Sequence, residues 1–482
     1  MDLSSPKTLR FLIQTEIPHS HLSDLLNFIY QKNILPLHSH FINIRRAILD
    51  GKETLEFTLF ESEGPWYIDV EIIAGNPIEI KMTPGSATPP QLISRLRESL
   101  LISIQRFEDE IRKTALYFVW VPDQDGISTK TSSGKRKLLH RIFTGNMLLF
   151  FIIFLALSYS IFFVLIELLR LPIKYFPLTL VIVQLIMIMF SHKIVEQMGD
   201  YPITERSSHV HILQCNFSRL EFYETVKKYP KETLLEIKKR IYDKTLRMGK
   251  PLDGDIVREV FYEYGINVNS ENMMIKSVNV YRTVKEAAER FKIPPPKIML
   301  SNIPVPNAAA TGPSPRYGLI LITTGLLIQL SEEEILSVIG HELSHIKRRD
   351  PIALFILSST EYLLRVYFFW QFIYLFGLFY LLFALGLIYF IAKFFESRAD
   401  LDSAIAIGTP QILADALRKI GHKRIQVERI LPNRVGGWLG WNPHPPISFR
   451  VERLERIRNL NEIRHPFLRS IKDCINGLLE SL

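Results

Sequence analysis

The rest of the chain is organised around His341-Glu342-Leu343-Ser344-His345, in which two histidines stand four residues apart and a glutamate follows the first. On a helix this spacing places both imidazoles on one face, one turn apart, where they can hold one metal ion. Zinc bound there lowers the pKa of a coordinated water towards ~7, and Glu342 can take the proton. Ser331 and Glu334 predict a capping box at the start of this helix. The stretch therefore predicts a zinc-binding helix.

A third metal ligand must come from elsewhere in the chain, because a catalytic zinc ion uses three protein ligands and one open position. The extended HExxHxxGxxH pattern is absent, since Arg348 stands where the glycine would be. Glu396 is the best candidate ligand. Asp400, one helical turn further, can accept a hydrogen bond from a ligand imidazole. Spacing alone fits equally well with a second interpretation, in which Glu396 and Asp400 form the solvated end of a membrane helix.

Two apolar segments upstream of the motif predict a membrane hairpin over residues 144–195. Residues 147–166 contain no charged side chain and are long enough to span a bilayer. The second segment, 176–190, reaches that length if the helix continues to Val195. Lys and Arg flank the outer ends of this hairpin more than its loop, so both termini and the catalytic domain should face the cytoplasm.

A second apolar region, 351–393, separates the zinc helix from Glu396. Because all ligands of one zinc ion lie within a few ångströms of it, the chain must cross the membrane an even number of times in between. The region is about long enough for two helices that turn near residues 371–377, and a shallower re-entrant pair fits the same parity. Glu361 and Arg365 lie one helical turn apart and can neutralise each other within the first helix.

The remaining segments have the character of soluble protein. Alternation of apolar and polar residues over 55–60 and 68–72 predicts strands, and apolar residues every fourth position over 92–104 predict a long helix. No catalytic constellation occurs there, so a docking or regulatory role is the simplest interpretation. The predicted organisation is a soluble α+β domain at 1–122, a basic linker at 123–143, the hairpin at 144–195, the first part of the catalytic domain at 196–350, the second hairpin at 351–393 and the second part of the catalytic domain at 394–482.

Composition excludes several classes of protein. The net charge is +9, but the chain has no basic tail and no nucleic-acid-binding motif, so no nucleic-acid partner is expected. Two cysteines, Cys215 and Cys474, provide neither a disulfide framework nor a cysteine-rich metal site. The first thirty residues lack a signal-peptide pattern, and we expect that the N-terminus is not exported. His209 and His211 share one face of a probable strand, where solvent-facing histidines are more common than metal ligands.

Several further motifs occur in a characteristic order around the zinc helix. They are Pro306 to Gly312, Thr323 to Leu327, Lys347 and Asp350, Glu396 with Ala399 and Asp400, and His444-Pro445-Pro446 with Arg450 and Leu454. With these motifs the chain resembles the HtpX family of membrane zinc metalloproteases, which are gluzincins related to the CAAX prenyl proteases. The resemblance covers roughly residues 144–460.

The resemblance implies one zinc ion per chain, held by His341, His345 and Glu396, with Glu342 as the general base. It also implies that His444 stabilises the oxyanion, that Arg450 organises this part of the site, and that Asn307 and Ala308 form an edge strand that pairs with the substrate backbone. Considered without the family, His444 is most simply a rigid loop residue and Arg450 a surface residue. The chain departs from the family at Ala309, where an aromatic residue is usual, and the first 120 or so residues have no counterpart in the short bacterial members.

The sequence thus predicts a mainly α-helical integral membrane protein with about four transmembrane helices, a zincin-type catalytic domain and an N-terminal soluble α+β domain. The predicted function is that of a zinc endopeptidase in the cell membrane that cleaves cytosol-facing segments of membrane proteins, including damaged ones. Its expected partners are membrane-protein or peptide substrates and the lipid bilayer, and the sequence does not indicate an oligomeric state. Two alternatives remain: a CAAX-type prenyl-peptide protease, and a non-catalytic membrane scaffold.

Overall fold

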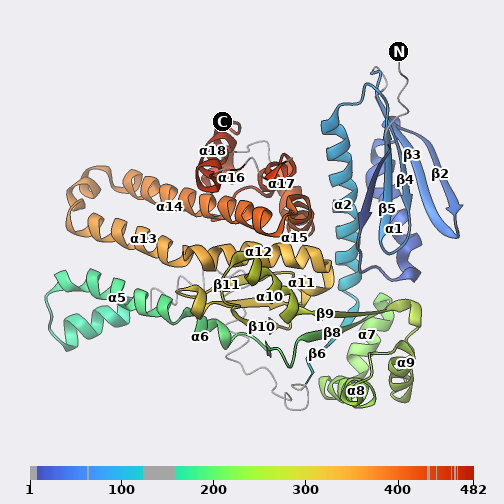
Figure 1. Cartoon of the computed structure of the whole chain (residues 1–482), viewed down its shortest axis with the longest axis horizontal. Helices are drawn as coiled ribbons and strands as arrows, with labels where there is room; N and C mark the ends of the chain where they lie inside the picture. The colour runs from blue at the N-terminus through green and yellow to red at the C-terminus, as the bar shows by residue number, and fades with distance from the viewer. Residues whose placement is uncertain are drawn as a thin grey trace.

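The computed structural model of the chain describes residues 8–61, 64–122, 158–430, 435–440, 442–457, 459–460, 463 and 465–482. The predicted basic linker, 123–143, and the part of the first membrane hairpin at 144–157 lie outside the described residues. Figure 1 shows a sheet domain at the N-terminal end, a central layer of mixed helices and strands, and a long projection of helices on the side away from the N-terminal sheet.

The N-terminal segment forms a five-stranded antiparallel sheet covered on one face by two helices. The predicted alternation is confirmed, because Leu55, Phe57, Ile68, Val70 and Ile72 are all buried between sheet and helices. The helix expected over 92–104 is α2, which is longer at both ends. The strand order is β1 (Leu9–Ile13), β5 (Ile78–Pro84), β4 (Tyr67–Ile73), β3 (Lys52–Phe60) and β2 (Phe41–Leu49). The helical elements are η1 (His19–His21), α1 (Leu22–Ile29), η2 (Tyr30–Ile34), η3 (Leu35–His40) and α2 (Pro90–Arg112).

A three-stranded antiparallel sheet joins this segment to the rest of the chain. Strand β6 (Ala115–Trp120) pairs with β8 (His209–Asn216), which pairs in turn with β9 (Met273–Asn279). Apolar side chains of this sheet pack against the helices α7 (Arg219–Lys228), α8 (Lys231–Lys244) and α9 (Gly254–Glu263). Short 3-10 turns follow α8 and precede β9, at η6 (Leu246–Met248) and η7 (Ser270–Asn272).

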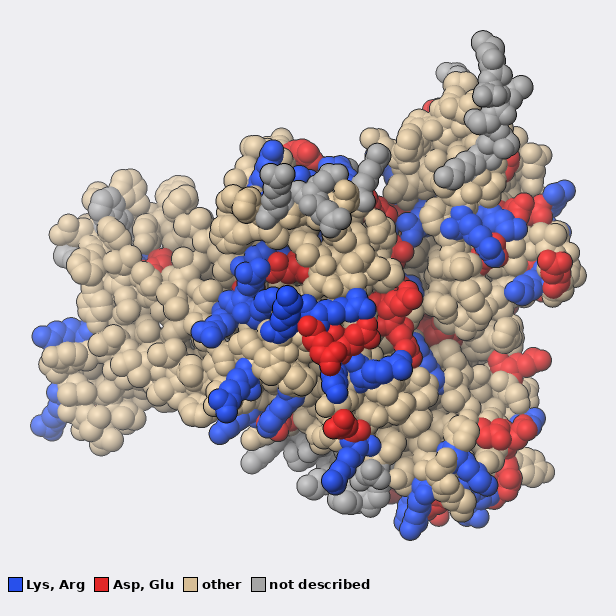
Figure 2. All heavy atoms as spheres, in the orientation of Figure 1, with Lys and Arg blue, Asp and Glu red and all other residues tan. Residues whose placement is uncertain are grey.

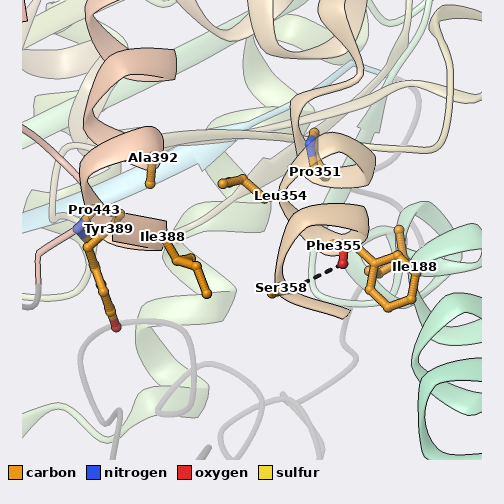
Figure 3. Close-up of a pocket in the computed structure, with 9 residues that line it drawn as sticks. All are labelled: Ile188, Pro351, Leu354, Phe355, Ser358, Ile388, Tyr389, Ala392 and Pro443. Carbon is orange, nitrogen blue, oxygen red and sulfur yellow. Dashed lines mark hydrogen bonds between the residues drawn. The ribbon is translucent and has the colours of Figure 1, made fainter. Parts of the chain in front are cut away.

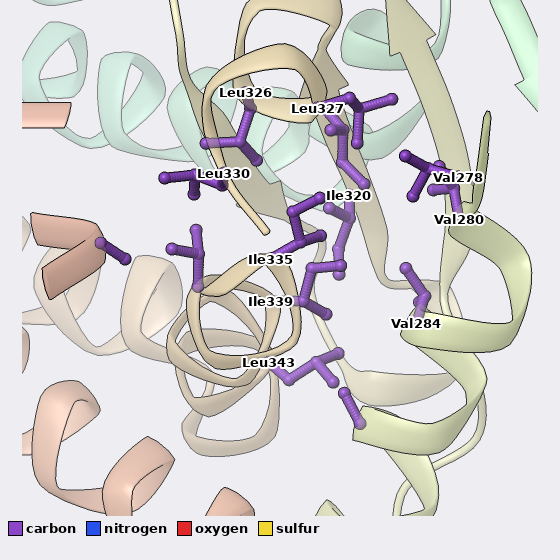
Figure 4. Close-up of a cluster of buried hydrophobic side chains, with 14 of the residues drawn as sticks. Val278, Val280, Val284, Ile320, Leu326, Leu327, Leu330, Ile335, Ile339 and Leu343 are labelled. Atoms are coloured by element: carbon purple, nitrogen blue, oxygen red, sulfur yellow. The ribbon is translucent and has the colours of Figure 1, made fainter. Parts of the chain in front are cut away.

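The central layer is a four-stranded sheet with helices packed on it. The strand order is β11 (Ala308–Thr311), β12 (Leu319–Thr323), β10 (Lys297–Ser301) and β7 (Tyr201–Ile203), and only β10 and β12 are parallel. The other elements are α10 (Val280–Phe291), η8 (Pro315–Tyr317), α11 (Thr324–Gln329) and α12 (Glu332–Arg348). Ile335, Ile339 and Leu343 recur every fourth residue on α12 and point into the core formed with Val284 and Ile320 (Figure 4). This face of α12 fixes the helix that carries the histidines.

The projection consists of apolar helices that leave the central layer side by side (Figure 1). The chain passes through η4 (Phe163–Leu168), η5 (Ile173–Tyr175), α5 (Phe176–Met189) and α6 (Ser191–Glu196), and later through α13 (Asp350–Tyr367) and α14 (Trp370–Ile407). Figure 2 shows that the projection is mostly free of charged side chains, whereas Lys, Arg, Asp and Glu are mixed over the rest of this face. As expected, Arg365 donates to Glu361, with 2.8 Å between Nε and Oε1.

The prediction of about four spans is not confirmed. Among the described residues one helix, Tyr374–Ile407, is long and apolar enough to cross a membrane. Helix α5 has 14 residues and is shorter than a bilayer requires. Helix α14 also continues past residue 393, where the sequence predicted the end of the hairpin. It continues because Lys393, Glu396 and Asp400 are shielded inside the protein with partners, so the charges do not mark a solvated end.

The C-terminal segment wraps around the ends of α12 and α14. It contains α15 (Pro410–Ile430), α16 (Val435–Leu439), α17 (Ile447–Glu455) and α18 (Pro466–Leu479). Helix α15 packs against α12 and α17 on one side and against α2 of the N-terminal segment on the other. Arg97 of α2 binds the Asp415 carboxylate through two hydrogen bonds of 2.8 and 2.9 Å, and this contact ties the N-terminal segment to α15.

Candidate active site

Helix α12 presents His341, Glu342 and His345 on the side away from its core-facing isoleucines. The predicted capping box is confirmed: the Glu334 N–H donates to Ser331 Oγ at 3.3 Å, and the Ser331 N–H donates to Glu334 Oε2 at 2.8 Å. The helix therefore begins at a defined residue, and the core contacts fix its rotation. Both imidazoles face α14, which crosses α12 at this level.

Three possible metal ligands meet where α12 and α14 cross. Ligand atoms of His341, His345 and Glu396 all lie within 4.8 Å of one another. The two Nε2 atoms are 3.3 Å apart, and each is 3.4 Å from an oxygen of Glu396. Two imidazoles and one carboxylate are a donor set that suits zinc, and their convergence on one point fits a single ion. The structure thus brings together the three residues that the sequence analysis selected as ligands.

The other nitrogen of each imidazole contacts a carboxylate. Asp400 Oδ1 is 2.9 Å from His341 Nδ1, and Asp350 Oδ2 is 2.8 Å from His345 Nδ1. A carboxylate at Nδ1 favours the tautomer with the proton on that atom and leaves Nε2 free for a metal. The contact of Asp400 agrees with the prediction from sequence. No such contact was predicted for Asp350, which stands five residues after His345, at the start of α13.

Helix α17 adds a buried arginine to the site. Arg450 donates to both oxygens of Asp400, with distances of 2.8 and 2.6 Å, and its Nη1 is 3.6 Å from Glu396 Oε2. Such a bidentate pair fixes the geometry of both side chains. His444, in the loop before α17, lies 2.8 Å from Glu396 Oε2 through its Nδ1. The interpretation of Arg450 as a surface residue is therefore wrong, since its side chain is buried among the candidate ligands.

The charge balance of the site favours a cation. Four carboxylates lie around the two imidazoles, namely those of Glu342, Asp350, Glu396 and Asp400. Two of them are paired with arginines, Asp350 with Arg398 and Asp400 with Arg450. Burial lowers the pKa of His341, but hydrogen bonds to Asp400 and Glu396 outweigh it and raise the pKa to about 10. The raised pKa of this imidazole reflects the negative charge of the carboxylates around it.

Strand β11 runs along the site at the edge of the central sheet. The N–H of Ala310 donates to Glu342 Oε2 at 2.9 Å, a contact that the sequence analysis did not predict. Before β11, the N–H of Asn307 donates to Thr323 Oγ1 at 2.8 Å and its carbonyl accepts from the Thr323 N–H at 3.0 Å. Ala308 begins the strand, which pairs with β12 on one side within the described sheet. On its other side β11 contacts α12.

An open, apolar pocket of about 260 Å³ lies between α5, α13 and α14 (Figure 3). Three of its residues are close in sequence to residues of the site: Pro351 follows Asp350, Ala392 precedes Glu396 by one helical turn, and Pro443 precedes His444. The pocket is lined by Ile188, Pro351, Leu354, Phe355, Ser358, Ile388, Tyr389, Ala392 and Pro443.

The two histidines of β8 are not part of this site. His209 and His211 lie in the three-stranded sheet, with ring centroids 6.1 Å apart. Burial, followed by the neighbouring His209, lowers the pKa of His211 to about 4. Among the residues that the structure describes, the cluster of possible metal ligands is the one between α12 and α14.

These features are those of the HExxH class of peptidases: a helix with two histidines and a glutamate, a third candidate ligand on a second helix and an adjacent edge strand. The model of Peptidase family M48 matches residues 275–458. The Protease HtpX homolog of Thermodesulfovibrio yellowstonii is 31% identical over 227 residues, which cover 40% of this chain and 78% of that protein. The homolog of Moorella thermoacetica is 32% identical over 220 residues, covering 38% and 74%. The chain therefore belongs to the HtpX family of M48 peptidases.

Proposed function

We propose that this protein is a zinc endopeptidase that cleaves cytosol-facing segments of membrane proteins, with damaged or misfolded proteins among its substrates. The observation that carries the proposal is the convergence of His341, His345 and Glu396 next to Glu342. Membership of a protease family supports the reaction type. Zinc, when bound, supplies a Lewis acid that lowers the pKa of a water molecule and polarises the peptide carbonyl.

Glu342 is the residue to which we assign proton transfer. It removes a proton from the attacking water and then passes it to the amine that leaves. Burial raises the pKa of its carboxyl more than His341 and His345 lower it, and a raised pKa suits a group that must both take up and release a proton. The hydrogen bond from the Ala310 N–H holds one of its oxygens in place.

Substrate binding and oxyanion stabilisation are assigned to the residues around this carboxylate. We assign to the edge of β11 that does not pair with β12 the binding of an extended substrate backbone, with Asn307 just before the strand and Ala308 at its start. His444 and Arg450 lie beside Glu396 and carry hydrogen-bond donors and positive charge close to the reacting carbonyl. Asp350 and Asp400 hold the imidazoles of His345 and His341.

The class of substrate is inferred from the position of the site. Helix α13 begins two residues after α12 ends, so the histidines lie at the base of the apolar projection. Helix α14, which carries Glu396, includes the segment that is long and apolar enough to cross a membrane. A substrate that reaches this site therefore lies close to the membrane surface, which favours segments of membrane proteins over freely soluble ones.

The test of the proposal is the variant Glu342→Gln, assayed with zinc analysis and with cleavage of a membrane-protein substrate. The variant should retain about one zinc ion per chain and lose proteolysis, because the amide cannot take up a proton. Wild-type protein without zinc, or a variant as active as the wild type, would refute the assignment.

A CAAX-type activity on prenylated peptides is the second candidate, and the open apolar pocket between α5, α13 and α14 is the feature that favours it, because an isoprenoid chain is apolar. Cleavage of a farnesylated peptide should be compared with cleavage of the same peptide without the lipid. Efficient cleavage only of the farnesylated form would replace the broader endopeptidase proposal with this one.

A further inference from the structure

The loop that carries His444 is held in place by helix α15. Arg424 Nη2 donates to the carbonyl oxygens of His444 and Pro445, at 3.1 and 3.2 Å. One turn later, Glu428 accepts from the backbone N–H groups of Ile447 and Ser448, at 2.9 and 3.0 Å. The two side chains also form an ion pair, with 3.3 Å between Arg424 Nε and Glu428 Oε1. One pair on α15 thus binds both sides of the same turn.

The sequence of the turn explains why it needs outside partners. Pro445 and Pro446 have no N–H group, and the Pro446 N-cap position of α17 has no side chain that accepts a hydrogen bond. The first N–H groups of α17 therefore lack a local acceptor, and Glu428 provides one. A carboxylate at this end of a helix is also favoured by the helix dipole. The carbonyl groups of His444 and Pro445 lie outside any helix or strand, and Arg424 donates hydrogen bonds to both.

This turn connects two side chains of the candidate active site. His444 stands at its beginning and contacts Glu396, and α17 continues from its end to Arg450, which binds Asp400. We infer that Arg424 and Glu428 are positioning residues of the peptidase: Arg424 fixes the part of the turn that carries the ring of His444, and Glu428 fixes the start of the helix that carries Arg450. The inference rests on the proposed function for its effect on catalysis, but its structural part can be measured without activity.

A purely structural role for the pair predicts different behaviour. If Arg424 only stabilised the fold, its loss would lower stability and zinc content, and its effect on turnover would add to that of removing His444. If Arg424 acts through His444, the losses of turnover caused by removing Arg424 and by removing His444 are not additive, because a displaced histidine and an absent histidine are equally ineffective.

The experiment compares Arg424→Gln in the wild-type and His444→Ala backgrounds of the full chain. In the wild-type background, kcat should fall about 10-fold or more, because small displacements of a catalytic group have large effects, while KM and zinc content stay close to wild type. In the His444→Ala background, Arg424→Gln should cause no further loss. Arg424→Lys, which keeps the charge but has no planar fork to reach both carbonyls, should lie in between.

A second readout follows the position of His444 itself. The rate at which diethyl pyrocarbonate modifies His444, measured by mass spectrometry, should rise in Arg424→Gln because the loop is released. Lys423→Gln is the matched control: Lys423 is the neighbouring cation on α15, and its Nζ lies 2.8 Å from Asp109. It should change neither the modification rate nor kcat.

Additive losses of kcat, or an unchanged modification rate of His444, would overturn the inference. An inactive wild-type protein would instead refute the proposed function, and the modification rate would still decide whether Arg424 positions His444. If Arg424→Gln does not fold, the same two readouts on Arg424→Lys decide the question.

Discussion

Asp350 and Asp400 each lie at the Nδ1 atom of one histidine of α12, and only the contact of Asp400 was predicted from the sequence. Asp400 lies one helical turn after Glu396, and the spacing makes its contact with His341 predictable. Asp350 belongs to the next helix, and its carboxylate reaches back to His345 because α13 starts only two residues after α12 ends. The sequence contains a signal for this contact in the five-residue step from His345 to Asp350.

Asp350→Asn tests this contact. The amide can place its NH₂ group at Nδ1 and favour the wrong imidazole tautomer, so zinc affinity should fall about 10- to 100-fold. The measurement is a zinc competition titration against a chelator of known affinity. Asp400→Asn is the parallel variant, and an affinity equal to wild type in both would contradict the role of these carboxylates.

The pH dependence of zinc binding follows from the state of His341. Hydrogen bonds to Asp400 and Glu396 outweigh burial and raise its pKa to about 10, so the metal-free protein carries a proton on this imidazole at neutral pH. Zinc binds only the neutral ring and must displace that proton. The apparent affinity should therefore rise about tenfold for each pH unit between about pH 6 and about pH 8. A flat profile over this range would show that no proton leaves the site on binding.

At the scale of the elements, the crossing of α12 and α14 determines whether Glu396 reaches the histidines. Gly340 allows the close approach, because a Cβ atom there would lie 2.7 Å from Ser403 Oγ and 2.9 Å from Ile407 Cγ1. Ser403 also donates to the Ser337 carbonyl at 2.8 Å. A larger side chain at Gly340 must push the helices apart.

Gly340→Ala should therefore destabilise the protein, although alanine is the better helix former. We expect a loss of about 1–3 kcal/mol from overpacking, together with weaker zinc binding. Gly254→Ala in α9 is the control, since its added Cβ would meet only the Met273 Cε atom, at 3.9 Å. Thermal unfolding should show a lower Tm for the first variant and no decrease for the second. A Gly340→Ala protein at least as stable as wild type would contradict this role of the crossing.

The sequence predicted secondary structure well where residues of one kind recur at a regular spacing. The strands around Leu55 and Ile68 and the capped zinc helix follow from alternation, from the four-residue spacing and from Ser331. The end of α14 did not follow, because Lys393 and Glu396 have the composition of a solvated helix end. Their partners, Gly440 and His444, lie more than forty residues away in the chain. Arg450 and its partner Asp400 are another such pair, which spacing alone does not reveal.

At the scale of the whole molecule, the apolar projection and the charged body form two distinct regions (Figure 2). The N-terminal segment belongs to the body and is bound to α15 through Arg97 and Asp415. If the projection enters the membrane, α13 leads away from the side of the membrane on which the catalytic residues lie, and α14 returns to that side. The turn between them then lies furthest from the zinc site.

Cysteine labelling tests this arrangement. Tyr374→Cys lies near the turn and Lys285→Cys lies on α10 of the body, and both positions are exposed. In sealed vesicles of one orientation, a membrane-impermeant maleimide should label only one of the two variants, and vesicles of the opposite orientation should reverse the result. Labelling of both from the same side would favour a shallow, re-entrant hairpin over two full spans.

The zinc content of Glu396→Ala tests most directly whether His341, His345 and Glu396 together hold one zinc ion. Wild-type protein, purified and dialysed against a weak chelator, should contain about one zinc ion per chain, and Glu396→Ala should contain far less at the same protein concentration. The variant Glu361→Ala, which removes a carboxylate of α13 paired with Arg365, should retain the zinc ion. Equal zinc content in Glu396→Ala and wild-type protein would show that Glu396 is not a ligand of the zinc ion.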